Sequence, residues 1–337
     1  MNQITLNISD YKLQCIFPTL DYILKRRIAK IFTPFMDGNS HFSHSRLTIL
    51  PVSMHANERP DQELENRIKN LIKIYLSKFP FTGDQETELN ILFCQIKPFL
   101  SNRDVIQHLR LMDRNESVSI LTIDQGCLIQ NHASFSSVLF LKSGFQWVKP
   151  LWDYSPVSTI TKAIYFVTAT SLPLSNAMML HGTGIERQKA GLLFLGSSGA
   201  GKTTIARFCK EEDVLADDAV LLRKKNNHYV ISSSPFNTGK SMFQKESRLT
   251  MVLFIEKDTY HGLEVVPPAT AGSIILKNHI HFFRNFSTEA VRKTFHQVAD
   301  LCREVPFYKL HFKKDSSFLK VIDQQLTESC GFIGSGG

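Results

Sequence analysis

The chain has 337 residues, a net charge of +8 and 43% hydrophobic residues. This length is enough for two ordinary domains, and the balance of apolar and charged residues is typical of a soluble globular protein. The six cysteines are scattered without a CxxC pair. This pattern indicates free thiols in a reducing compartment and excludes a disulfide framework or a cysteine metal site.

The sequence predicts a cytoplasmic protein without a membrane partner. Its first 14 residues alternate apolar and polar side chains, and they lack the basic and then apolar layout of a signal peptide. The most apolar long window, residues 163–180, is interrupted by Pro173, Ser175 and Asn176. A buried helix and strand therefore account for it better than a membrane span does.

Basic residues cluster at residues 25–27, 223–225 and 313–314. Solvated helix faces and turn tips are the simplest interpretation of such clusters, and attraction of an acidic or phosphorylated partner is the sharper one. No interleaving of aromatic and basic residues accompanies them. We therefore expect no nucleic-acid partner.

Residues 1–150 predict a separate α+β domain. Apolar residues recur on one helical face within residues 20–32 and again within residues 62–79. Strand patterns occupy residues 1–14, 46–52, 117–132 (as a hairpin with a turn at Asp124-Gln125-Gly126) and 136–144. This part contains no repeat and no motif with recognisable chemistry, so its role stays open, with acceptor recognition as one interpretation.

Residues 151–330 predict a second domain, and residues 331–337 a flexible tail. A helix is expected at residues 159–172, followed by a strand, a polar turn at residues 186–189 and another strand. A further strand pair turns at Asn226-Asn227. The rest predicts a strand, a mixed helical region, a short strand and a final helix.

The segment GSSGAGKT, Gly196–Thr203, matches the phosphate-binding pattern G-x-x-x-x-G-K-[ST]. An apolar strand precedes it and a helix follows it, which is the context that this loop requires. Backbone N–H groups would form an anion cradle, with Lys202 at the β- and γ-phosphates and the Thr203 hydroxyl on Mg²⁺. We expect the nucleotide to bind Gly196, Ser197, Ser198, Gly199, Ala200, Gly201, Lys202, Thr203 and Thr204.

Asp217 and Asp218 lie side by side in the apolar stretch VLADDAV. Adjacent carboxylates in a strand cost free energy unless a cation or a hydrogen-bond donor satisfies them. Since strand neighbours point to opposite sides, we expect only one of them to face a given metal. A nucleotide-bound Mg²⁺ would account for one and a substrate hydroxyl for the other; the alternative is a turn pair at a strand end.

His181 precedes the loop by one strand. If the strands on the two sides of turn 186–189 pair, His181 lies near the loop. A lone histidine in an apolar strand is more often a core residue, so both interpretations stay open.

The order of His181, the glycine-rich loop and Asp217-Asp218 resembles the kinase domain of the HPr kinase/phosphorylase family over roughly residues 150–326. It is still more similar to HPr-kinase-related proteins that lack the usual N-terminal domain, and phosphoenolpyruvate carboxykinases share the arrangement. The resemblance implies an α/β fold, α+β overall. It would consist of a P-loop kinase domain with a mixed sheet, preceded by the separate N-terminal domain.

The resemblance also implies roles for the residues. Asp217 and Asp218 would share the metal and general-base roles, while His181 supports the charged centre and Lys202 neutralises charge on the moving group. We expect Asp218, with Thr203, on Mg²⁺ and Asp217 on the acceptor, and the reverse division stays open. Lys240 is either an extra phosphate contact or a solvated lysine.

One departure from the family concerns the reverse reaction. The family's Pro-Gly-Arg-Asn segment is linked to dephosphorylation, and the nearest segment here contains Arg284-Asn285 without the Pro-Gly. This argues against a phosphorylase reaction and against HPr as the partner. Related kinases act on hydroxyls of peptides during natural-product maturation or on small molecules such as free serine.

Together these features predict an ATP-dependent kinase that acts on a hydroxyl, most simply Ser or Thr of a peptide or protein, with ATP and Mg²⁺ as cofactors. The alternatives are a small-molecule kinase and a nucleotide-dependent ATPase or switch. The aspartates follow Lys202 by only fifteen residues, which is too soon for a conventional P-loop ATPase. Whether the protein forms a homo-oligomer stays open.

Overall fold

The computed structural model of the chain divides into two compact units. One comprises Met1–Ser171 with Arg284–Thr288, and the other comprises Leu172–Phe283 with Glu289–Gly337. The structure describes residues 3–8, 10–17, 20, 22–37, 43–52, 62–77, 84–97, 118–123, 126–142, 156–237 and 245–331. The helix predicted at residues 159–172 falls almost entirely in the first unit, whereas we expected the boundary before it. The roles of the two domains stay predictions.

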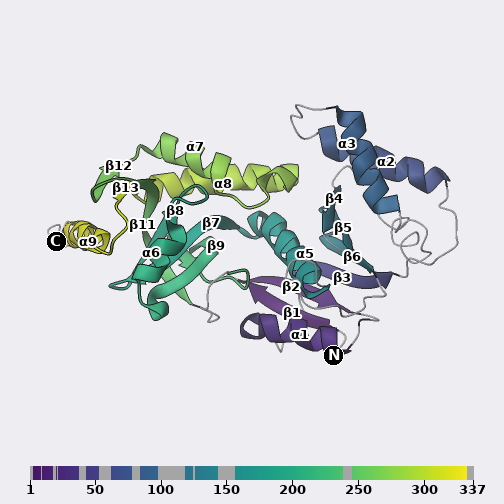
Figure 1. Cartoon of the computed structure of the whole chain (residues 1–337), viewed down its shortest axis with the longest axis horizontal. Coiled ribbons are helices and arrows are strands. Elements are labelled where there is room, and N and C mark those ends of the chain that lie inside the picture. The colour runs from purple at the N-terminus through teal and green to yellow at the C-terminus, as the bar shows by residue number, and fades with distance from the viewer. Residues whose placement is uncertain are drawn as a thin grey trace. The chain divides into compact units, whose positions relative to one another are not determined.

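The first unit is built on a six-stranded mixed sheet (Figure 1). Its strands are β1 (Gln3–Ile8), β2 (Tyr11–Ile16), β3 (Ser45–Val52), β4 (Val118–Ile123), β5 (Gly126–Asn131) and β6 (Ser136–Lys142). Its helices within the described residues are α1 (Tyr22–Phe32), α2 (Gln62–Ser77), α3 (Gln85–Ile96), α5 (Pro156–Ser171) and the 3-10 turn η1 (Thr33–Phe35).

The sheet of the first unit has the order β1-β2-β3-β6-β5-β4. β3 runs parallel to β2 and β6, and the other neighbours are antiparallel. Burial alternates along β1 and β2, as expected where one side of a strand faces a core. α5 packs against β3, β4, β5 and β6 and against α1, while α2 and α3 pack on each other and on β4.

The N-terminal strand pattern divides into two strands. Asp10 has a positive φ of 65°, and Ile8 pairs with Tyr11 across the turn. Aspartate tolerates the left-handed region better than most residues, so a reversal fits here within a continuous alternating pattern. α3 was not expected from the sequence, although Asp84 caps it by accepting hydrogen bonds from the backbone N–H groups of Glu86 and Thr87.

The second unit is built on a seven-stranded mixed sheet. Its strands are β7 (Ala177–Arg187), β8 (Ala190–Leu195), β9 (Val214–Lys225), β10 (His228–Ser232), β11 (Glu246–Lys257), β12 (Gly262–Val265) and β13 (Phe307–Phe312). Its helices within the described residues are α6 (Lys202–Phe208), α7 (Pro268–Asn278), α8 (Thr288–Glu304) and α9 (Phe318–Gly331), with 3-10 turns η3 (Leu172–Ser175) and η4 (Glu211–Asp213). A further 3-10 turn, η5 (Phe283–Asn285), and the first residue of α8 fall mostly in the segment grouped with the first unit.

The order of this sheet is β10-β9-β7-β8-β11-β13-β12. β8, β11 and β13 are parallel, whereas the other neighbours in this order run antiparallel. β10 also pairs with β11, which closes β10, β9, β7, β8 and β11 into a ring. Both predicted hairpins are confirmed. The turn predicted at residues 186–189 is shorter, at residues 188–189, because Glu186 and Arg187 still belong to β7, and the second turn is at Asn226-Asn227 as predicted.

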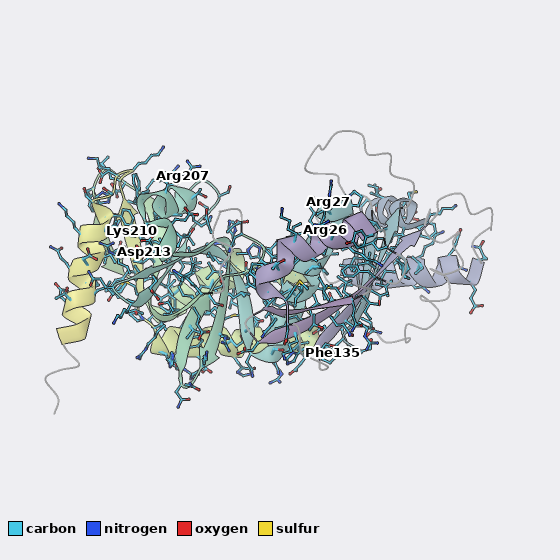
Figure 2. The ribbon with its side chains drawn as sticks, turned by 90° about the horizontal axis from the view of Figure 1, so that it is seen from below. Arg26, Arg27, Phe135, Arg207, Lys210 and Asp213 are labelled. Atoms are coloured by element: carbon cyan, nitrogen blue, oxygen red, sulfur yellow. The ribbon has the colours of Figure 1, made fainter. Side chains whose placement is uncertain are left out.

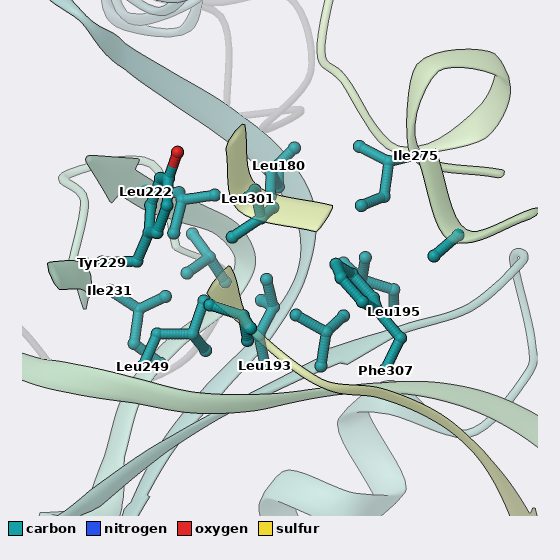
Figure 3. Packing of buried hydrophobic residues seen from close by; sticks show 14 of the residues in the cluster. Leu180, Leu193, Leu195, Leu222, Tyr229, Ile231, Leu249, Ile275, Leu301 and Phe307 are labelled. Carbon is teal, nitrogen blue, oxygen red and sulfur yellow. The ribbon is translucent and has the colours of Figure 1, made fainter. Parts of the chain in front are cut away.

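Helices cover both faces of this sheet. Leu193 and Leu195 of β8 face the cluster that contains Ile275 of α7 and Leu301 of α8 (Figure 3). Leu192 and Phe194, the alternate residues of the same strand, face the cluster that contains Ile205 of α6 and Phe318 of α9. A strand buried on both faces reads as a continuous apolar run, which explains the sequence LLFL before the glycine loop.

The predicted basic clusters lie at the surface. Arg26 and Arg27 are exposed on α1 (Figure 2), and Lys224 and Lys225 form ion pairs with Glu304 and Glu246. These are the solvated faces that the simpler interpretation predicts. No helix of the described ranges is long and apolar enough to cross a membrane. The predicted tail, apart from Gly331, lies outside the described residues.

Candidate functional site

The glycine loop, residues 196–201, connects β8 to α6. Gly199 and Gly201 have φ angles of 76° and 119°, which residues with a side chain rarely adopt. A Cβ on Gly196 would lie 2.8 Å from the Cβ of Ala200. Glycine at these positions is therefore required by the shape of the loop. The tip, residues 197–199, is exposed.

Lys202 begins α6 and is only 9% exposed. Its Nζ donates hydrogen bonds to the carbonyl oxygens of Gly196, at 2.8 Å, and Ser197, at 3.1 Å. Burial lowers the pKa of the amine, and the Asp218 and Asp217 carboxylates oppose that shift. The lysine thus ties the loop to itself and lies within electrostatic reach of both aspartates. Thr203, the next residue, is exposed.

Strand pairing brings the other predicted residues to the loop. Leu195, the last residue of β8, pairs with Gly182 of β7, the neighbour of His181. On the other side of β7, Asp218 pairs with Gly182, and Asp217 pairs with Thr183. His181, the start of the loop and both aspartates therefore lie side by side where β8 ends, at the middle of β7 and within β9. The pairing of β7 with β8 is the one that the sequence analysis required to bring His181 near the loop.

The two aspartates differ in environment. Asp217 is 7% exposed, and the Thr183 hydroxyl donates a 2.9 Å hydrogen bond to its Oδ1. The Asp218 side chain is 39% exposed, and its Oδ1 lies 2.9 Å from Nδ1 of His181. The hydrogen bond from His181 holds the pKa of the Asp218 carboxyl below its ordinary value; burial opposes this shift, and the Lys202 charge assists it.

Asp218 also departs from strand geometry, with a φ of 92°. The rule that strand neighbours point to opposite sides therefore does not hold at this pair. Both carboxylates act on the amine of Lys202. The expectation of regular alternation fails here because nothing in the local sequence indicates the positive φ of Asp218.

Two further histidines reach the site from the connection after α7. Ile280 forms an antiparallel bridge with Leu180 of β7. The bridge places His279 beside His181 and His281 beside Asp218. The rings of His181 and His281 meet edge to face, with centroids 5.3 Å apart. Burial lowers the pKa of both His279 and His281 to about 4, so both rings are neutral at neutral pH. The sequence analysis missed them; the only signal was the alternating HIH in NHIHFF.

Lys240 lies outside the described residues. Arg284 and Asn285 are described, but they are grouped with the first unit. Among the described residues, no group of three or more His, Cys, Asp and Glu side chains is placed to hold a metal ion.

The fold is mixed α/β. One of the solved structures to which the chain is similar is the HPr(Ser) kinase/phosphatase from Coxiella burnetii. It shares 13% sequence identity, with 47% of this chain and 96% of that chain covered at a TM-score of 0.30. No curated protein matches the chain. Residues 153–327, more than half of the chain, match the family described as SynChlorMet cassette protein ScmC, and the chain belongs to that family.

Proposed function

We propose that the protein is an ATP-dependent kinase that transfers the γ-phosphate to a hydroxyl, with Ser or Thr of a peptide or protein as the acceptor. The observation that carries the proposal is the convergence of Lys202 with Asp217 and Asp218. The charges of both carboxylates raise the pKa of the lysine amine. A cation for the phosphates and carboxylates for the acceptor are the two halves of a phosphoryl-transfer site. In this proposal the catalytic group comprises Lys202, both aspartates and His181.

The glycine loop fits a nucleotide triphosphate. Its tip is exposed, and a Cβ at Gly199 would meet no atom within 4 Å, so a ligand has room to approach the backbone. The Lys202 amine donates to loop carbonyls, and it could exchange them for phosphate oxygens without leaving the loop. The nucleotide would be held by residues 196–204.

In the division expected from the sequence, Thr203 and Asp218 would hold Mg²⁺, and both are accessible beside the loop. Mg²⁺ usually combines one or two protein groups with substrate phosphates. When bound, it would neutralise charge on the phosphate oxygens.

The accessibility of the aspartates suggests how this chain handles the acceptor. The Asp218 carboxylate is accessible to a bound substrate, whereas Asp217 is buried and already accepts a hydrogen bond from Thr183. If Asp218 holds the metal, Asp217 must receive the hydroxyl proton from within. In the reverse division, Asp218 accepts that proton on its carboxylate, with His181 fixing its orientation. The exposed fractions favour this second division.

The description of the family bears on the identity of the acceptor. The family is described as a cassette protein, so the products of neighbouring genes are the first candidates. We assign acceptor recognition to the first unit, since the second contains the loop and the aspartates. A free small molecule such as serine is the alternative acceptor, and ATP hydrolysis without an acceptor is the alternative activity.

The proposal is tested by incubating the protein with γ-labelled ATP and a cell extract, beside Lys202→Ala as the matched control. We expect label in a protein or peptide with the wild-type chain and none with the variant. Label in a small metabolite would support the small-molecule kinase. Label recovered only as free phosphate would overturn the kinase proposal in favour of an ATPase.

A further inference from the structure

The segment of residues 279–281 completes the sheet beside β7. β8 pairs with β7 only along residues 182–187, so it does not reach the first part of β7. There the segment is joined instead, through hydrogen bonds from the N–H of His181 to the carbonyl of His279, at 2.7 Å, and from the N–H of His281 to the carbonyl of Met179, at 3.2 Å. The segment is therefore fixed to the strand that carries His181.

Asp218 has a backbone conformation that needs support. Its φ of 92° is unusual for a residue with a Cβ, and such conformations persist only when the surrounding structure holds them. Gly182, opposite Asp218 on β7, offers no side chain for this purpose. Nε2 of His281 lies 3.3 Å from the Asp218 carbonyl oxygen.

The chemistry of that contact fixes the proton. A backbone carbonyl only accepts hydrogen bonds, so Nε2 of His281 must carry the hydrogen and donate it. His279 repeats the arrangement, because its Nδ1 lies 3.3 Å from the His181 carbonyl oxygen. Each partner of the Asp218–His181 pair is thus held at its backbone by one imidazole of the segment.

We propose that His281 is a positioning residue: its Nε2–H holds the Asp218 peptide in the positive-φ conformation that turns the carboxylate toward His181. The inference rests on the proposed function for its effect on phosphoryl transfer, but not for its effect on Asp218 itself. His281 also meets the His181 ring edge-on. The charged or titratable groups that act on it are His181, Asp218 and Lys202, from β7, β9 and α6.

The first test measures the conformation directly. His281→Phe keeps a ring but removes the donor, whereas His281→Gln keeps an N–H donor at a similar reach. The three-bond HN–Hα coupling of Asp218, in protein labelled with ¹⁵N-aspartate, distinguishes positive φ from an extended strand. We expect the wild-type value in His281→Gln and a shift toward the strand value in His281→Phe. An unchanged coupling in His281→Phe would overturn the inference.

The second test measures transfer. We expect kcat to fall about tenfold in His281→Phe with KM for ATP nearly unchanged, because misplacing one group costs rate more than nucleotide binding. His281→Gln should restore most of the rate. His228, whose Nδ1 lies 3.1 Å from the carbonyl of Asn226, makes the same kind of contact on β10, and His228→Phe serves as the matched control.

The outcomes separate the two proposals. If the wild-type protein transfers no phosphate, the proposed function fails, while the Asp218 coupling still decides the role of His281. If His281→Gln and His281→Phe lose rate and thermal stability equally, His281 is only structural, and the inference is overturned. Should His281→Phe not fold, His281→Met removes the donor with a flexible apolar side chain and takes its place in both measurements.

Discussion

The glycine loop and the segment 279–281 meet β7 at neighbouring residues, but different interactions hold them there. The loop follows directly from β8, whose Leu195 pairs with Gly182, and its own glycines and Lys202 shape it. The segment comes from far along the chain, 98 residues after His181 in the case of His279, and strand pairing holds it. One side of the site, the glycine loop, is thus shaped by residues close in sequence. The other side, the segment of residues 279–281, is held by tertiary structure.

The largest effect is expected from a change in the glycine loop. Lys202→Ala removes the amine that would meet the phosphates, and it frees the carbonyls of Gly196 and Ser197. We expect transfer to fall by about a thousandfold, with weaker nucleotide binding, because preorganised charge is usually the largest catalytic contribution. Label-transfer rates and ATP titration measure both. Unchanged turnover would remove the loop from the active site.

The second largest effect is expected at Asp217 and Asp218. Asp218→Asn is expected to lower transfer by about a hundredfold, the range for loss of a general base. If ATP–Mg²⁺ affinity is kept in Asp218→Asn, Asp218 serves the acceptor; if affinity falls there and Asp217→Asn instead loses only rate, Asp218 holds the metal. His181→Ala at wild-type activity would return that residue to a core role.

The buried histidines of the segment 279–281 should make the stability of the protein depend on pH. The pKa of buried His279 is about 4 in the folded protein and near 6.5 in the unfolded chain, so unfolding takes up a proton between these values. The contribution of His279 to stability is therefore lost as pH falls from 6.5 toward 4, by about 2 kcal/mol at pH 5, and His281, whose pKa is lowered equally, adds a similar loss. Denaturant unfolding at pH 7 and pH 5 measures this loss. It should shrink in His279→Gln and persist in His228→Gln.

The smallest effect separates strain from crowding within the loop. Gly199→Ala meets no atom within 4 Å, so only its positive φ is penalised, whereas a Cβ on Gly201 would also lie 3.1 Å from the Phe312 ring. We expect a loss of unfolding free energy of about 1 kcal/mol at Gly199 and somewhat more at Gly201. Equal losses in denaturant melts would mean that the ring moves aside freely.

Short-range patterns predict the loop and the approach of His181 to it, whereas the place of His181 beside the aspartates was implied by the family resemblance. The loop requires glycines at fixed spacing, and the hairpin of β7 and β8 brings His181 to it. Patterns of this range could not predict the φ of Asp218, since its support comes from His281. For the same reason His279 and His281 were missed: their role exists only once residue 280 bridges to Leu180.

The pairing of β10 with β11 limits how the site can move. A closed ring of strands cannot splay or shear without breaking backbone hydrogen bonds, so β7, β8 and β9 form a stiff frame under the site. Movement on binding a ligand then falls to the connections at the strand ends, such as the tip of the glycine loop. A protein that works through large domain motions would need a more open sheet. An enzyme that must position two substrates benefits from a rigid one.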